Sequence, residues 1–69
     1  MDWFVYIVEC ADKSYYTGVT TDIDRRILEH NTSTFGSKYI RSRRPVRLAY
    51  HEKKRTKSQA LRKELEIKQ

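Results

Sequence analysis

The run WFVYIVEC, from Trp3 to Cys10, is the feature that most constrains the fold. Nearly all of its residues are apolar, aromatic or β-branched, which is typical of a strand buried on both faces. Residues 11–13 form a short turn, and Ser14 to Val19 have the composition of a second strand. The two strands therefore predict a hairpin, in which Gly18 lets a neighbouring group approach the backbone closely.

The next segment begins with a helix start signal. Thr21 to Asp24 resembles a capping box, with Asp in place of the usual Glu. It predicts a helix from about Asp22 to Asn31, followed by a polar loop to Gly36. The basic stretch Lys38 to Arg44 is expected to form at most one helical turn.

The rest of the chain predicts one strand and one helix. After Pro45, VRLAYHE alternates, which places Val46, Leu48 and Tyr50 on one face of a third strand. A final helix is expected from about Thr56 or Ser58 to Gln69. The order ββαβα predicts an α+β fold, with a three-stranded antiparallel sheet flanked by helices.

Size and cysteine content bound the architecture. A chain of 69 residues is expected to form one domain, residues 1–69, with marginal stability. Cys10 is the only cysteine, so no disulfide framework exists, and a lone thiol fits a reducing compartment. Because no apolar run approaches a membrane span and the N-terminus lacks a basic signal region, we expect a cytoplasmic location without membrane association.

The charge is concentrated in one segment. The net charge is +6, and residues 37–57 contain nine Lys or Arg against one acid, Glu52, so that this segment carries +8 and the rest −2. A concentrated basic patch favours a nucleic-acid partner, although it can also be a solvated surface that aids solubility.

Helical geometry places two polar residues beside the core. Ile23 and Ile27 define the apolar stripe of the first helix, and Arg26 and His30 flank it, one turn apart. Arg25 and Glu29 are expected on the solvent side, so the two neighbouring arginines have different surroundings.

The last helix repeats this pattern. Leu61 and Leu65 are expected to be its buried stripe, with Glu64 and Lys68 flanking it and Glu66 facing water. An inward carboxylate needs a cation or an ion pair. Glu64 is therefore either a metal ligand or the partner of Arg26 or another base.

Two strand tyrosines complete the candidate set. Tyr6 shares a face with Phe4 and Val8, and Tyr16 lies two residues before Gly18. Strand tyrosines usually serve packing, which is the simplest interpretation of Tyr15 and Tyr50. Taken together, however, Tyr6, Tyr16, Arg26, His30 and Glu64 are coherent for phosphodiester cleavage, since they offer a proton acceptor, a phosphate ligand and a metal ligand.

These five positions resemble the GIY-YIG nuclease superfamily, and most closely its small stand-alone bacterial domain proteins. The first half-motif corresponds to Phe4-Val5-Tyr6 and the second to Tyr16-Thr17-Gly18. The family's arginine falls on Arg26, its following His or Tyr on His30, and its glutamate on Glu64. The resemblance covers nearly the whole chain and keeps the order and spacing of all five positions.

The resemblance implies a three-stranded antiparallel sheet flanked by helices and an endonuclease that depends on Mg²⁺ (or Mn²⁺). Tyr16, helped by Tyr6 or His30, would accept the proton of water, while Arg26 would bind the phosphate and Glu64 the metal. DNA is favoured over RNA as the substrate. Because no separate DNA-binding domain is present, cleavage would be weakly specific or directed by a protein partner.

Two alternatives remain open. The first is a non-catalytic nucleic-acid binding module, and the second is a protein-interaction module whose basic patch meets an acidic partner. Cys10, His30 and His51 lack the paired spacing of a structural zinc site. In either nucleic-acid hypothesis, the residues expected to grip phosphates or stack on a base are Lys38, Tyr39, Arg41, Arg43 and Arg44.

Overall fold

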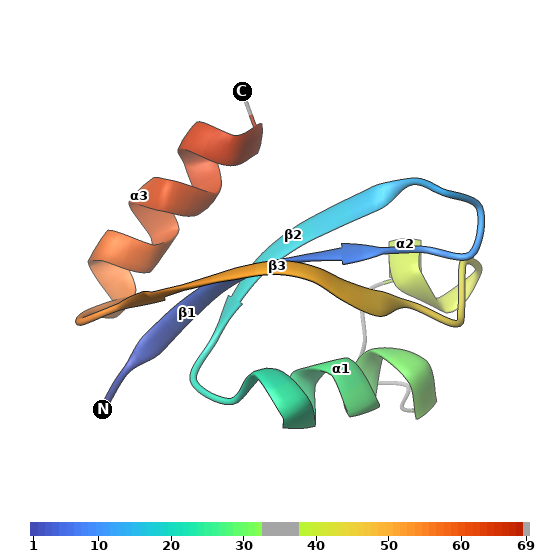
Figure 1. Cartoon of the computed structure of the whole chain (residues 1–69), viewed down its shortest axis with the longest axis horizontal. Coiled ribbons are helices and arrows are strands. Elements are labelled where there is room, and N and C mark those ends of the chain that lie inside the picture. The colour runs from blue at the N-terminus through green and yellow to red at the C-terminus, as the bar shows by residue number, and fades with distance from the viewer. Residues whose placement is uncertain (33–37, 69) are drawn as a thin grey trace.

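Three strands form one antiparallel sheet in the order β2-β1-β3. The computed structural model describes residues 1–32 and 38–68, and its strands are β1 (Trp3–Glu9), β2 (Tyr15–Thr20) and β3 (Arg47–Lys54). Helices α1 and α3 lie on opposite sides of this sheet (Figure 1). The predicted α+β fold with a three-stranded antiparallel sheet is therefore confirmed.

The helices begin within one residue of the predicted starts. The helices are α1 (Ile23–Thr32), α2 (Lys38–Arg41) and α3 (Lys57–Lys68). Asp22 caps α1, because its Oδ1 accepts a hydrogen bond of 3.0 Å from the backbone N–H of Arg25. The basic stretch forms the single turn α2, as predicted. The expected loop from residue 33 and the expected helix end at Gln69 lie outside the described residues.

The central strand is buried on both faces, as its composition predicts. Val5, Tyr6 and Val8 are at most 1% exposed, although they alternate between the two faces. One face packs on α3, and the other packs on α1 and α2, where Tyr6 and Val8 join Ile40 in the main core. Each face of β1 therefore supplies one wall of the protein's interior.

A bulge in β3 overturns one prediction. Ile7 of β1 pairs with Tyr50, whereas the next residue, Val8, pairs with Leu48, so Ala49 is an extra residue. The bulge places Leu48 and Tyr50 on opposite faces, and the prediction that they share a face was wrong. Both side chains are also substantially exposed.

Helix α3 packs through a different stripe from the one predicted. Leu61 and Leu65 are 42% and 60% exposed, whereas Ala60 is fully buried. Ala60, Glu64 and Ile67 follow the spacing of one helical face, and all three are buried or half-buried. The expected leucine stripe was therefore wrong, because the small Ala60 lets the helix approach the sheet on that side.

Candidate active site

A buried hydrogen bond joins β1 to α1. The Tyr6 hydroxyl lies 2.8 Å from Nε2 of His30, and the two residues are 1% and 0% exposed. Arg26 lies one turn before His30 on the same helix and is half-buried. The predicted inward lean of Arg26 and His30 is therefore confirmed, and the structure brings both of them to Tyr6.

Burial keeps His30 neutral. Desolvation, followed by the positive charge of Arg26, lowers the pKa of His30 to about 4. Its Nδ1 atom has no hydrogen-bond partner among the residues described by the structure. A neutral imidazole leaves one ring nitrogen free to accept a hydrogen bond, and Tyr6 can donate it.

The lowered pKa of His30 predicts a pH-dependent stability. The ordinary pKa of histidine is about 6.5, so between that value and about 4 the folded state binds fewer protons than the unfolded chain. The contribution of neutral His30 to the free energy of unfolding should be fully present above about pH 6.5. The free energy of unfolding should then fall by about 2 kcal/mol on acidification to pH 5. Denaturant titrations at pH 8 and pH 5 measure this loss.

The matched control is His30→Gln, which keeps a polar side chain but cannot titrate. Its free energy of unfolding should lack most of the wild-type decrease between pH 8 and pH 5. Equal slopes in the two proteins would contradict the assignment to His30.

Gly18 makes room for the Tyr6 ring. Gly18 lies directly opposite Tyr6 on β2, and a Cβ atom at this position would stand 2.6 Å from the Tyr6 oxygen. Tyr6 therefore extends across the neighbouring strand, and this is the close approach that the sequence predicts for Gly18.

Arg26 has two partners in the site. Burial raises the pKa of Tyr6, and a hydrogen bond with the Arg26 guanidinium acts in the opposite direction. Nη1 of Arg26 also lies 3.1 Å from Oε1 of Glu29. Glu29 was expected on the solvent side, but its carboxylate is half-buried because it turns toward the guanidinium one turn earlier.

Tyr16 is the more accessible of the two tyrosines. It packs edge-on against His30, with ring centroids 5.4 Å apart, and stacks against Tyr39 at 6.2 Å. Together with Tyr15, Thr17, Tyr39 and Lys68 it lines a pocket of about 390 Å³. A water molecule or a substrate can therefore reach Tyr16, whereas Tyr6 and His30 are closed off.

Glu64 lies on α3 and is the carboxylate among the five candidate catalytic residues. Its side chain is 20% exposed, and its Oε2 lies 3.3 Å from Nζ of Lys68. Glu64 is close enough to Tyr6 for its charge to act on that hydroxyl. Of the expected alternatives, an ion pair is present, but its partner is Lys68 and not Arg26.

The metal expected from the family resemblance has a limited set of ligands here. No group of three His, Cys, Asp or Glu side chains among residues 1–32 and 38–68 could hold a metal ion. Mg²⁺ keeps several waters and needs only one or two carboxylates when substrate phosphates complete its shell. A single half-buried carboxylate, Glu64, fits this open kind of site.

The residues expected to grip nucleic acid divide into two groups. Arg43 packs on the Tyr39 ring at 3.8 Å and pairs with Asp12 at 3.0 Å, while Arg44 donates to the backbone carbonyl of His30. These two arginines therefore hold α2 and α1 in place. Lys38 and Arg41 are exposed and available to a partner.

Two residues near the site were not among the candidate site residues chosen from the sequence. Asn31 exchanges two hydrogen bonds with the backbone of Val46, at 2.8 and 3.1 Å, and thereby fixes the end of α1 beside His30. Lys68 lines the Tyr16 pocket and pairs with Glu64. The spacing of four residues between Glu64 and Lys68 was a usable signal of an ion pair on one helix face. Nothing in the sequence indicates that Asn31 binds the backbone of Val46.

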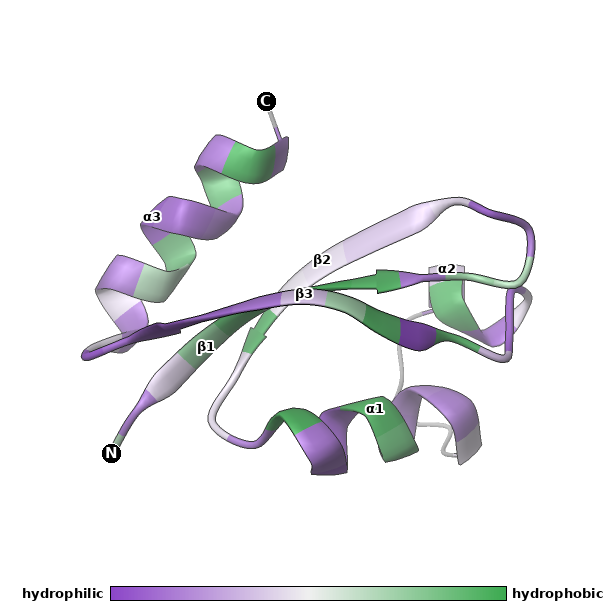
Figure 2. Ribbon diagram, viewed as in Figure 1, coloured by the Kyte–Doolittle hydropathy of each residue, from purple (hydrophilic) through white to green (hydrophobic). Residues whose placement is uncertain are grey.

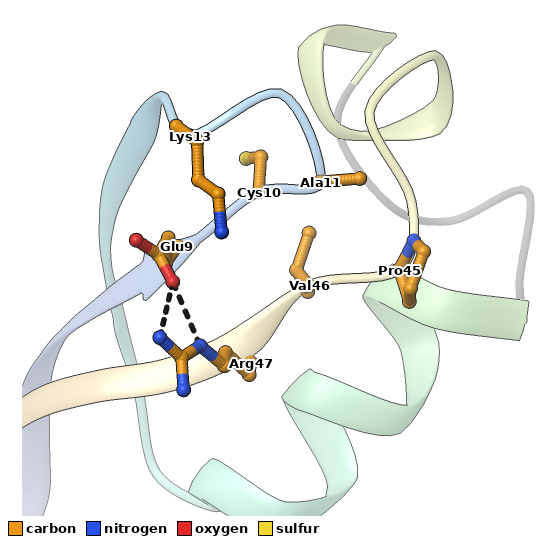
Figure 3. Close-up of a pocket in the computed structure, with 7 residues that line it drawn as sticks. All are labelled: Glu9, Cys10, Ala11, Lys13, Pro45, Val46 and Arg47. Atoms are coloured by element: carbon orange, nitrogen blue, oxygen red, sulfur yellow. Dashed lines mark hydrogen bonds and ion pairs between the residues drawn. The ribbon is translucent and has the colours of Figure 1, made fainter.

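A second pocket lies at the hairpin end of β1 (Figure 3). It has a volume of about 210 Å³ and is lined by residues 9–11, Lys13 and residues 45–47. Glu9 and Arg47 form an ion pair of 2.6 Å across its opening. None of the five candidate catalytic residues lines this pocket.

The chain is similar in sequence to known proteins over nearly its whole length. No helix in the described part of the chain is long and apolar enough to cross a membrane. The chain is 60% identical over 67 residues to the UPF0213 protein DP2720 of Desulfotalea psychrophila, covering 97% of the chain but 61% of that relative. It is 52% identical to the UPF0213 protein VNG_2274C of Halobacterium salinarum, covering 94% of the chain and 83% of the relative.

A solved structure and a family model complete the comparison. The solution NMR structure of the UPF0213 protein BH0048 from Bacillus halodurans matches with a TM-score of 0.58 and 50% identity, over 99% of this chain and 71% of that one. The model of the GIY-YIG catalytic domain matches residues 2–69. The chain therefore belongs to the GIY-YIG catalytic domain family.

Proposed function

We propose that this protein is a metal-dependent endonuclease that hydrolyses a nucleic-acid phosphodiester, with DNA favoured over RNA. The observation that carries the proposal is the cluster in which Tyr6 contacts both His30 and Arg26 over Gly18. Burying polar groups costs stability unless they are hydrogen-bonded, and clusters of buried polar groups with shifted pKa values are typical of functional sites. Membership of a nuclease-type family supports the same conclusion.

Arg26 is the proposed phosphate ligand. A guanidinium can bind two phosphate oxygens at once and can stabilise the charge that develops during attack on phosphorus. Its resting partner is Glu29, at 3.1 Å. A phosphate group that enters the site would replace this carboxylate as the partner of Arg26.

Tyr16 is the proposed contact for the attacking water, because it is the tyrosine that lines an open pocket. Its oxygen would accept the proton of the water while its own hydroxyl proton passes to solvent through the open pocket. The water oxygen would form the new bond to phosphorus as the bond to the leaving oxygen breaks, and the leaving oxygen would take a proton from solvent. Tyr6 and His30 are buried beneath it. Their role in the proposal is to position Arg26 and the Tyr16 ring and to hold a proton between them.

Glu64 would hold Mg²⁺ (or Mn²⁺), which would neutralise charge on the phosphate and on the leaving oxygen when bound. In the structure this carboxylate contacts Lys68. Lys68 would therefore have to leave Glu64 and could then turn toward the phosphate, because it lines the same pocket as Tyr16.

The test is cleavage of labelled single-stranded DNA, duplex DNA, flapped DNA and RNA, with and without Mg²⁺ or Mn²⁺. Arg26→Gln should lower the rate of metal-dependent cleavage by about 10²-fold, because it removes one preorganised positive charge. The adjacent Arg25→Gln is the matched control. Arg25 is exposed, so this variant should stay within about twofold of the wild type.

Two outcomes would contradict the proposal. Equal losses in the Arg25 and Arg26 variants would show that net charge, and not the site, carries the activity. Salt-sensitive binding of nucleic acid by the wild type without any metal-dependent product would leave the non-catalytic binding module.

A further inference from the structure

A second concentration of positive charge lies away from the candidate active site. Residues 53–57 contain four cations and no acid. We call them the basic turn, because β3 ends at Lys54 and α3 begins at Lys57. Its members are Lys53, Lys54, Arg55 and Lys57.

The basic turn and α2 lie at opposite ends of the molecule. Figure 1 places the β3–α3 connection at one end of the long axis and α2 near the other. Figure 2 shows hydrophilic colour over the last part of β3, where it enters this connection. The exposed cations Lys38 and Arg41 of α2 therefore form a separate surface.

Hydrogen bonds hold the backbone of the basic turn in a defined shape. The backbone N–H of Gln59 donates to Oγ1 of Thr56 at 3.1 Å, and the backbone N–H of Arg55 donates to Oε1 of Gln59 at 3.1 Å. The ammonium of Lys57 lies 5.4 Å from the centre of the Trp3 ring. The cations are thus carried by an ordered segment, which lowers the entropic cost of binding a partner.

The positive charge of this surface is only partly neutralised. Lys53 pairs with Asp2 and Lys54 with Glu52. The exposed Arg55 and Lys57 form no ion pair with a carboxylate in the described part of the chain. The basic turn therefore keeps two cations without a carboxylate partner among the described residues.

Helix α3 connects this surface to the candidate active site. Glu64 follows Lys57 by seven residues, or about 10 Å along the helix axis. One strand of a DNA duplex carries a phosphate about every 3.4 Å along its axis. The separation of Lys57 and Glu64 along the axis of α3 therefore corresponds to about three phosphates.

We infer that the basic turn is a second phosphate-binding surface, which holds the nucleic-acid backbone about three nucleotides from the phosphate that is cut. The position of the cut relative to this surface rests on the proposed function. The binding of phosphates by the basic turn does not depend on it. It follows that the substrate must extend past the active site along α3 by about this length.

The test compares two double variants that lose the same charge. Arg55→Gln/Lys57→Gln changes the basic turn, and Lys13→Gln/Arg25→Gln changes two exposed cations elsewhere. The probe is a labelled 20-base-pair DNA duplex, titrated without metal between 50 and 200 mM salt. The slope of log affinity against log salt should fall by about 1.8 in the first variant, since each phosphate contact contributes about 0.9, and should stay at the wild-type value in the second.

Cleavage gives an independent second measurement. KM for the duplex should rise in Arg55→Gln/Lys57→Gln while kcat is kept. Shortening the substrate on one side of the cut to fewer than three nucleotides should have the same effect on the wild type. A salt slope equal to that of the control variant would overturn the inference, as would the absence of salt-sensitive binding by the wild type. A changed slope without any cleavage would support the surface and contradict the nuclease proposal.

Discussion

Replacing Glu64 with glutamine is expected to remove metal-dependent cleavage, by about 10³-fold or more, while binding of nucleic acid in the absence of metal is kept. Glutamine has nearly the same shape but lacks the charge that a hard cation such as Mg²⁺ requires. The structure offers no nearby group of acids in its described part that could replace Glu64. Single-turnover cleavage and a direct titration of Mn²⁺ into the protein measure the two losses separately.

Glu66→Gln is the matched control for this prediction. It removes the same charge from the same helix, but Glu66 is exposed. Its rate of cleavage and its affinity for Mn²⁺ should stay within about twofold of the wild type. The stability of both variants should change little, because the Glu64–Lys68 pair is partly exposed and such pairs contribute about 0.3–0.5 kcal/mol. Retained cleavage in Glu64→Gln would contradict the role of Glu64 as a metal ligand.

Gly18→Ala is expected to damage both stability and activity. The added methyl group would stand 2.6 Å from the Tyr6 oxygen and 2.8 Å from the Cζ atom that carries it. Tyr6 is 1% exposed and its hydroxyl is hydrogen-bonded to His30, so its ring has little room to move. We expect a loss of about 1–3 kcal/mol in the free energy of unfolding and a fall in cleavage, because the Tyr6–His30 bond is broken.

A double-mutant cycle identifies the cause of this loss. In a Tyr6→Leu background the group that meets the new methyl is gone, so Gly18→Ala should cost much less than in the wild type. Denaturant titration of the four proteins gives the coupling energy. An equal cost in both backgrounds would show that Tyr6 is not the group that requires glycine at this position.

The local elements could be predicted because their signals are local. The apolar composition of WFVYIVEC identified the central strand. The capping-box pattern from Thr21 and the hydroxyls of Thr56 and Ser58 predicted the two helix starts, although only the structure shows that Asp22 and Thr56 are the caps. The helical period also predicted that Arg26 and His30 turn toward the sheet, since that conclusion needs only the position of Ile27 on the same helix.

Two predictions failed where the answer depended on pairing between distant segments. The β3 alternation was expected to continue from Val46 to Tyr50, but the bulge at Ala49 is a property of the β1–β3 register. The leucines of α3 were expected to face the core because they are the largest apolar residues of that helix. The sheet instead accepts the stripe that contains the small Ala60, and the leucines remain exposed.

Some features of the candidate site also required the tertiary structure. The sequence could not show that Tyr6 is hydrogen-bonded to His30, that the Tyr6 ring crosses Gly18, or that Glu29 turns toward Arg26. Each of these contacts joins side chains whose distance depends on how two elements pack or on which rotamer the packing leaves open.

By itself, the sequence determined the order of strands and helices, the charge of the basic segments and the residue types available for phosphate chemistry. These properties follow from composition and from periodicities of two and 3.6 residues, which depend only on residues that are close together in the sequence. The tertiary structure alone decided which tyrosine reaches solvent, which face of α3 is buried and which charges are paired. Those properties depend on the packing of segments that are far apart in the chain, where one shifted register or one small side chain changes which groups meet.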